Sequence, residues 1–161
     1  HLEIHGNTLY MTSNRVIFIL DITNPISPSL IGSIDLGASY EAYEIHRAGN
    51  FIYSVAKPQE LLRAIDISDP ANPVVTYTSI HLGDGHDFGS IAGNDSKIYI
   101  GTRDGSNGTI RSYDIGTNPG TPVFEEAISA TDGIYEVYLH DDNTLISGNK
   151  NGDTQVFTIC I

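Results

Sequence analysis

Short runs of apolar residues, several of them alternating with polar ones, fill this chain, and clusters of turn-forming residues separate them. Val16–Leu20 and Phe51–Ala56 are representative, because β-branched and aromatic side chains dominate both runs. No window shows the sustained i, i+3, i+4 apolar spacing of an amphipathic helix. The 16 glycines and seven prolines also interrupt any longer element. The pattern therefore predicts an all-β protein made of many short strands.

One turn-forming motif occurs three times and divides the chain into repeats. Its copies are Asp21–Pro28, Asp66–Pro73 and Asp114–Pro122, and six of the seven prolines lie in them. A repeat of roughly 40–50 residues is typical of the four-stranded blades of β-propellers.

The motif predicts a joint between a strand and the outer strand that follows it. The side chain of its first aspartate can accept the backbone N–H two residues later, as in an Asx-turn. The two prolines keep the chain extended and donate no hydrogen bond, which suits the start of an edge strand. We expect a structural role in the turn for nine residues: Asp21, Pro25, Pro28, Asp66, Pro70, Pro73, Asp114, Pro119 and Pro122.

The sequence Asp-Ile-Ser-Asp-Pro-Ala-Asn-Pro at residues 66–73 resembles the LVIVD repeat. The resemblance extends over the whole chain, in three clear copies and one degenerate copy. It implies a β-propeller, and it implies a protein that is secreted or exposed at the cell surface. It says little about activity, because the matched residues form turns.

These repeats predict one β-propeller domain or propeller segment with about four blades of four antiparallel strands. The expected blades are residues 1–36, 37–82, 83–129 and 130–161. The last blade has Thr158 at the position of the motif aspartate and lacks its outer strand. Three interpretations remain open: a four-bladed ring, part of a larger ring, or a unit that another chain completes at its open blade edges.

The net charge of −12 changes which partners are expected. Nucleic acids bind basic patches, so the charge argues against them. No apolar run approaches the ~20 residues of a membrane-spanning helix, so no membrane insertion is predicted. A protein partner, or self-association through open blade edges, is the partner class that we expect.

Polar residues gather in the segments that join one expected blade to the next. In a propeller these segments converge near the axis, where carboxylates and a histidine could bind a divalent cation, either calcium or a transition metal. The alternative is a solvated acidic rim, which a chain of this charge presents without any function. No cofactor is predicted. The ligand or metal candidates are Glu41, Glu44, Asp84, His86, Asp87, Asp132 and Glu136.

No sequence motif identifies a catalytic site, so the chain is not predicted to be an enzyme. Two Asn-x-Ser/Thr triplets, at Asn94 and Asn107, could carry glycans in a secreted protein. The expected function is a non-enzymatic extracellular or cell-surface module for binding or protein–protein assembly. The alternatives are a structural subunit that polymerises through open blade edges and a metal-assisted enzyme that uses the loops at the channel mouth.

Overall fold

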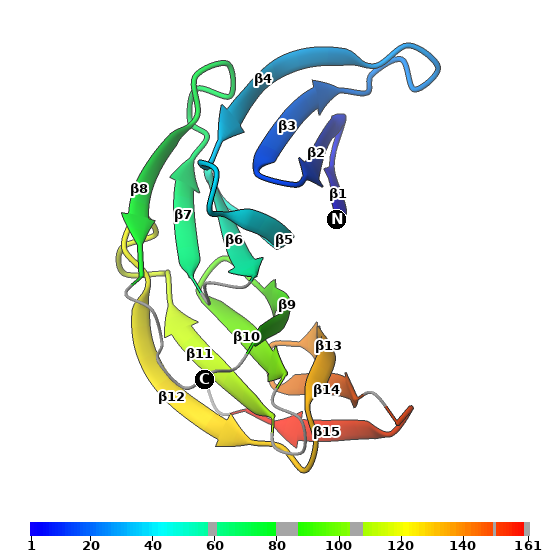
Figure 1. Cartoon of the computed structure of the whole chain (residues 1–161), viewed down its shortest axis with the longest axis vertical. Coiled ribbons are helices and arrows are strands. Elements are labelled where there is room, and N and C mark those ends of the chain that lie inside the picture. The colour runs from blue at the N-terminus through cyan, green and yellow to red at the C-terminus, as the bar shows by residue number, and fades with distance from the viewer. Residues whose placement is uncertain (58–60, 80–86, 104–107, 150, 160–161) are drawn as a thin grey trace.

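Four antiparallel sheets form an open arc in the computed structural model of this chain (Figure 1). The structure describes residues 1–57, 61–79, 87–103, 108–149 and 151–159. Neighbouring sheets stack face to face around the arc, and the first strand of each sheet lies on its concave side (Figure 1). This arrangement confirms the all-β propeller architecture that the repeat predicts.

Each blade is an antiparallel meander that begins at its innermost strand. Blade one comprises β1 (Leu2–His5), β2 (Thr8–Ser13), β3 (Val16–Asp21) and β4 (Ser29–Asp35). Blade two comprises β5 (Glu41–Ala48), β6 (Phe51–Lys57), β7 (Leu62–Asp66) and β8 (Val74–Thr78).

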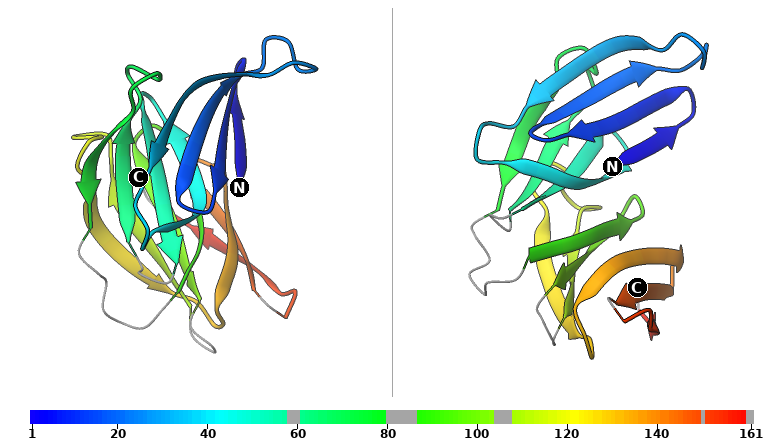
Figure 2. Two further views of the ribbon diagram at one scale, coloured as in Figure 1. Left: turned by 45° about the horizontal axis from the view of Figure 1, so that its top comes forward. Right: turned by 45° about the vertical axis from the view of Figure 1, so that its right-hand side comes forward.

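The second half of the chain repeats this order (Figure 2). Blade three comprises β9 (Asp87–Gly93), β10 (Lys97–Arg103), β11 (Thr109–Asp114) and β12 (Val123–Ser129). Blade four comprises β13 (Ile134–Asp141), β14 (Thr144–Asn149) and β15 (Thr154–Thr158). Within the described residues this blade has three strands, so the predicted absence of its outer strand is confirmed.

Tight two-residue turns fix the register of the hairpins. His5 pairs with Thr8 and Ala48 pairs with Phe51, so β1–β2 and β5–β6 are joined in the same way. Gly49 has φ of 52°, a conformation that glycine adopts at little cost and that matches the twist of hairpin strands. Equal turns place equivalent residues of the two blades on the same face.

The hydrophobic core lies between blades and not within them. Three clusters of buried residues occupy the junctions of blades one and two, two and three, and three and four. Tyr10, Tyr53 and Tyr99 take the same place in these three clusters and are at most 6% exposed. A blade therefore gains most of its stability from its neighbours, as in other repeat architectures.

Among the described residues, no helix is long and apolar enough to cross a membrane.

Candidate functional site

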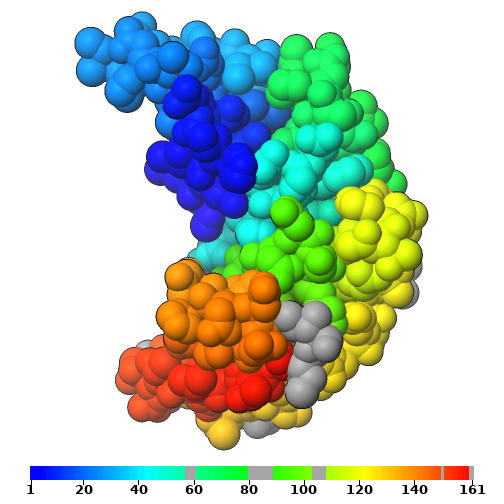
Figure 3. Space-filling model, turned by 180° about the vertical axis from the view of Figure 1, so that it is seen from behind, coloured from blue at the N-terminus to red at the C-terminus, as the bar shows by residue number. Residues whose placement is uncertain are grey.

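The innermost strands β1, β5, β9 and β13 line the concave side of the arc, which Figure 3 shows as a hollow between the first and last blades. A pocket of about 210 Å³ lies there and receives residues from all four strands. Glu3 of β1 and His46 of β5 line it together with His1 and Ile45, and mainly apolar residues of β9 and β13 form the rest of the wall.

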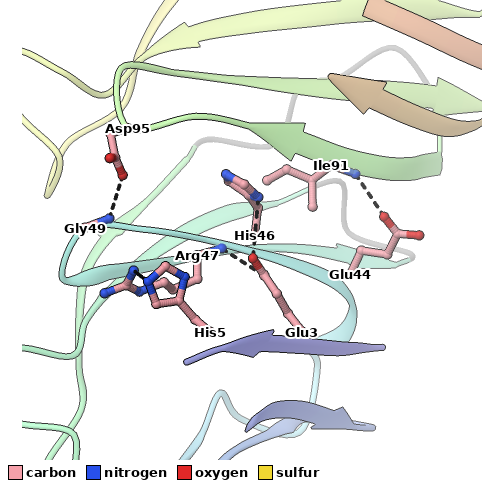
Figure 4. Close-up of polar contacts among 8 residues, drawn as sticks. All are labelled: Glu3, His5, Glu44, His46, Arg47, Gly49, Ile91 and Asp95. Carbon is pink, nitrogen blue, oxygen red and sulfur yellow. Dashed lines mark hydrogen bonds and ion pairs between the residues drawn. The ribbon is translucent and has the colours of Figure 1, made fainter. Parts of the chain in front are cut away.

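A polar cluster joins β1 to β5 at this pocket (Figure 4). The Glu3 carboxylate accepts the backbone N–H of Arg47 at 2.9 Å and lies 3.8 Å from Nδ1 of His46. The Arg47 guanidinium lies 2.8 Å from Nε2 of His5. None of these four side chains was among the predicted site residues of the chain, because a contact between blades leaves no motif in one strand.

Burial changes the proton affinity of this cluster. Desolvation raises the pKa of Glu3, although the hydrogen bond and charge of Arg47 oppose the change. Desolvation also lowers the pKa of His46 to about 4, against the attraction of Asp95. His46 is therefore neutral at pH 7, and its buried Nε2 has no hydrogen-bond partner among the described residues.

A hydrogen bond between inner strands repeats from blade to blade. Glu44 accepts the backbone N–H of Ile91 at 3.0 Å, and Ser90 Oγ accepts the backbone N–H of Val137 at 2.9 Å. Glu44 and Ser90 are equivalent by strand register, and Glu136 occupies the same position in blade four. This position thus connects blade two to blade three and blade three to blade four.

The predicted acidic residues are spread along the described inner strands and loops. Glu41 is exposed on β5, Glu44 is almost buried between blades, and Glu136 is exposed on β13. Asp132 accepts hydrogen bonds from the Gly133 backbone and from the side-chain amide of Asn151.

Three other candidates lie at the edge of what the structure describes. Asp84 and His86 fall outside the described residues, and of Asp87 only its place in β9 is described. In the described part of the chain, no three His, Cys, Asp or Glu side chains converge as metal ligands would.

All three motif aspartates accept the backbone N–H two residues later. The distances are 2.7 Å for Asp21, 2.8 Å for Asp66 and 2.9 Å for Asp114. A hydrogen bond from the Thr23 side chain, with the backbone bond second, lowers the pKa of Asp21. A hydrogen bond from the Thr117 side chain, with the backbone bonds after it, lowers the pKa of Asp114. The motif therefore forms Asx-turns that are tightest when the carboxylates are ionised.

The proline segments also contact the preceding blade. A Cβ added to Gly32 of β4 would lie 2.2 Å from the carbonyl oxygen of Pro70. The Tyr53 hydroxyl donates a hydrogen bond to the carbonyl of Pro119 at 2.9 Å. In the equivalent segment of blade one, Ile26 is 92% exposed among the described residues.

The side chain of Asn94, one of the two candidate glycosylation residues, forms hydrogen bonds within the protein. Asn94 Oδ1 accepts two backbone N–H groups of its own turn, and Nδ2 donates to Asp142 of blade four at 3.0 Å. A glycan on Nδ2 would displace this contact between blades. Asn107 lies outside the described residues.

The outward face of blade one carries apolar side chains in two rows across the sheet. Strand pairing places them as Leu2–Met11–Phe18 and Ile4–Leu9–Leu20–Leu30. Leu2, Ile4 and Leu30 are more than 60% exposed. A contiguous exposed apolar face of this kind marks a surface for interaction.

The outward face of blade four carries a shorter apolar row. Tyr138, Ile146 and Val156 are aligned by strand pairing, and Tyr138 and Val156 are 59% and 66% exposed. In the described residues β15 pairs only with β14, so its other edge adds an open ladder of backbone groups beside this row. Sequence reasoning anticipated open edges, whereas the apolar faces could be found only by aligning strand positions across blades.

Comparisons with known proteins agree with this architecture. The model of the LVIVD repeat family matches residues 1–36 and 41–78. No curated protein matches the chain significantly.

Solved structures are similar over nearly the whole chain. The computationally designed protein Ika4 matches with a TM-score of 0.69 and 22% identity, over 99% of this chain and 89% of Ika4. A protein from Lactobacillus plantarum matches with a TM-score of 0.84 and 10% identity, over 100% of this chain and 51% of that protein. The periplasmic gluconolactonase of Pseudomonas aeruginosa matches with a TM-score of 0.78 and 12% identity, over 96% of this chain and 47% of the enzyme.

At these identities the likeness concerns the fold alone. The chain spans about half the length of both natural proteins. The sequence match, the repeated turns and the stacked sheets lead to one assignment. This chain has the β-propeller architecture, and its first two blades match the model of the LVIVD repeat family.

Proposed function

We propose that this chain is a non-enzymatic β-propeller module that assembles with protein partners, outside the cell or at its surface. The observation that carries the proposal is the pair of uncovered apolar faces at the two ends of the arc. Leu2 and Ile4 at one end and Val156 at the other are each more than 60% exposed. Burying such surface is the main favourable contribution to protein association.

The chemistry of these faces favours protein over other ligand classes. Charged side chains are nearly absent from the rows on blade one, although the chain carries a net charge of −12. Depletion of charge at the centre of a patch is typical of protein–protein interfaces. The open edge of β15 gives a partner backbone groups to pair with as well.

Footprinting with hydroxyl radicals tests this function. The reactivity of Leu2 and Tyr138 is compared between the dilute purified chain and the protein in the cells or medium that produce it. Assembly predicts strong protection of both residues in the native setting. Val123, which is 54% exposed on the outer strand β12, should react equally in both. Equal reactivity of all three residues would contradict the proposed function.

The location is proposed because the resemblance of this chain to the LVIVD repeat implies a protein that is secreted or exposed at the cell surface. Intact producing cells are treated with an amine-reactive label that does not cross membranes. The proposed location predicts that the protein is labelled on these cells or is found in their medium. Labelling only after lysis would refute the location and leave the assembly role standing.

A further inference from the structure

The innermost strand of blade one has an apolar position that its equivalents bury. Strand register makes Leu2, Ile45, Ile91 and Val137 equivalent. The last three pack against the preceding blade and are 2%, 6% and 4% exposed, whereas Leu2 is 62% exposed. Blade one therefore presents the surface that the other blades use to contact a neighbour.

The next strand shows the same difference. Leu9 of β2 is equivalent to Ile52, Ile98 and Leu145, all of which are fully buried. Leu9 is only half-buried. Two independent strands thus identify the missing contact as a blade.

Among the described residues, nothing covers the opposite face of blade four. Ile146 occupies the position at which Tyr10, Tyr53 and Tyr99 pack against the following blade. It is half-buried, and its neighbour Val156 is 66% exposed. The two ends of the arc are therefore of complementary kinds: one is the surface that receives a preceding blade, and the other receives a following blade.

The size of the arc indicates how many copies of the chain would cover the exposed apolar faces of both blade one and blade four. The natural propellers that match nearly all of this chain are about twice as long. A second arc of the same size would place the last blade of each copy against the first blade of the other. Each copy then covers both apolar faces of its partner, and the contact closes after two copies because the arc spans about half a ring.

We propose that two copies of this chain associate head to tail into a closed ring, with blade four of each copy packed on blade one of the other. The inference rests on the proposed assembly function and names the partner. The head-to-tail arrangement also places Glu136 beside β1 of the other copy. Glu44 and Ser90, its equivalents, accept a backbone N–H from the next inner strand, and Leu2 holds the equivalent donor position on β1.

Light scattering coupled to size-exclusion chromatography, over a range of loading concentrations, tests the proposal. The unmodified chain should elute as a discrete species of twice its 17.4 kDa mass. Leu2→Lys and Val156→Lys should each weaken association at least tenfold (about 1.4 kcal/mol or more). Both side chains are exposed in the single chain, so neither change should prevent folding.

Val123→Lys is the matched control, since Val123 is a similarly exposed valine on a strand that lies at neither end of the arc. Lysine makes the chain less negative, so a loss of association cannot be assigned to added repulsion. Mixing the Leu2→Lys and Val156→Lys variants should restore part of the association, because one of the two contacts is then intact.

Three results would overturn the proposal. A monomer at every concentration means that copies of this chain do not cover the faces. A polymer that grows with concentration means that the contact does not close. A dimer that survives Val156→Lys but not Leu2→Lys means that two first blades pack together. If footprinting shows protection in the native setting while the chain remains monomeric, the assembly function stands and the partner is a different protein.

Discussion

Burial of His46 against Glu3 makes the junction of blades one and two sensitive to pH. The pKa of His46 is lowered to about 4, so the folded state binds no proton there at pH 5.5, whereas the unfolded chain does. A lowered histidine pKa gives stability that is present at neutral pH and is lost as the pH falls below about 6.5. Between pH 7 and pH 5.5 this linkage should cost about 1 kcal/mol of the free energy of unfolding.

Urea unfolding at the two pH values checks this prediction. His46→Gln should lose most of the difference, while replacement of the exposed His140 by Gln should keep it. Burial raises the pKa of Glu3, and this change acts in the opposite direction, because the folded state then binds a proton on Glu3 more readily as the pH falls. An unchanged slope in His46→Gln would contradict this account of the junction.

Ser90 tests the repeated hydrogen bond between inner strands. Its fully buried hydroxyl accepts the backbone N–H of Val137, and Ser90→Ala leaves that donor buried and unpaired. We expect a loss of about 1–3 kcal/mol in the free energy of unfolding. Ser129→Ala, at an exposed serine of the same blade, should change it by less than about 0.5 kcal/mol. Equal values for the two variants would mean that this contact does not hold blades together.

At the scale of the element, close packing of β4 on the next proline segment predicts a steric effect. The Cβ of Gly32→Ala would meet the Pro70 carbonyl oxygen at 2.2 Å, and backbone atoms cannot move aside as a side-chain tip can. The variant should lose about 1–3 kcal/mol of stability. Gly148→Ala is the control, because its Cβ would lie 3.9 Å from the nearest atom. Thermal melts should therefore separate the two variants clearly, and a coincidence of their midpoints would contradict the packing.

The turns could be predicted from the sequence, but the packing of β4 on the proline segment could not. Asp66 and its prolines act within a few residues, so their spacing predicts the strand–turn–strand joint. The contact of Pro70 with Gly32 joins two blades, and nothing in either segment alone indicates it. The same limit applies to the inner strands. Glu44 was predicted as a rim carboxylate, and its hydrogen bond to Ile91 depends on how two sheets stack.

For the whole molecule, the number and order of blades followed from the repeat, because the turn motif recurs once in each of the first three blades and the strand pattern continues into a fourth. The uncovered faces could not be predicted from the repeat. Leu2 and Leu9 look like ordinary strand residues in the sequence, and only the structure shows that their equivalents in the other blades are buried. Their exposure depends on how the blades are arranged in the arc and not on the sequence of any single strand.

Salt gives a prediction about the whole molecule. Two copies that each carry a net charge of −12 repel one another, and salt screens that repulsion while leaving apolar contact intact. Raising sodium chloride from about 0.05 to 0.5 M should therefore tighten the association severalfold in sedimentation velocity. Weaker association at high salt would mean that ion pairs, and not the apolar faces, hold the copies together.

Small-angle X-ray scattering of the unmodified chain, at a concentration where the associated species dominates, tests the central claim most directly. The account predicts a compact closed ring, with a distance distribution that has one maximum and ends near the width of one propeller. A distribution with a long tail, as expected for arcs joined end to end, would contradict it. So would scattering that fits a single open arc at every concentration.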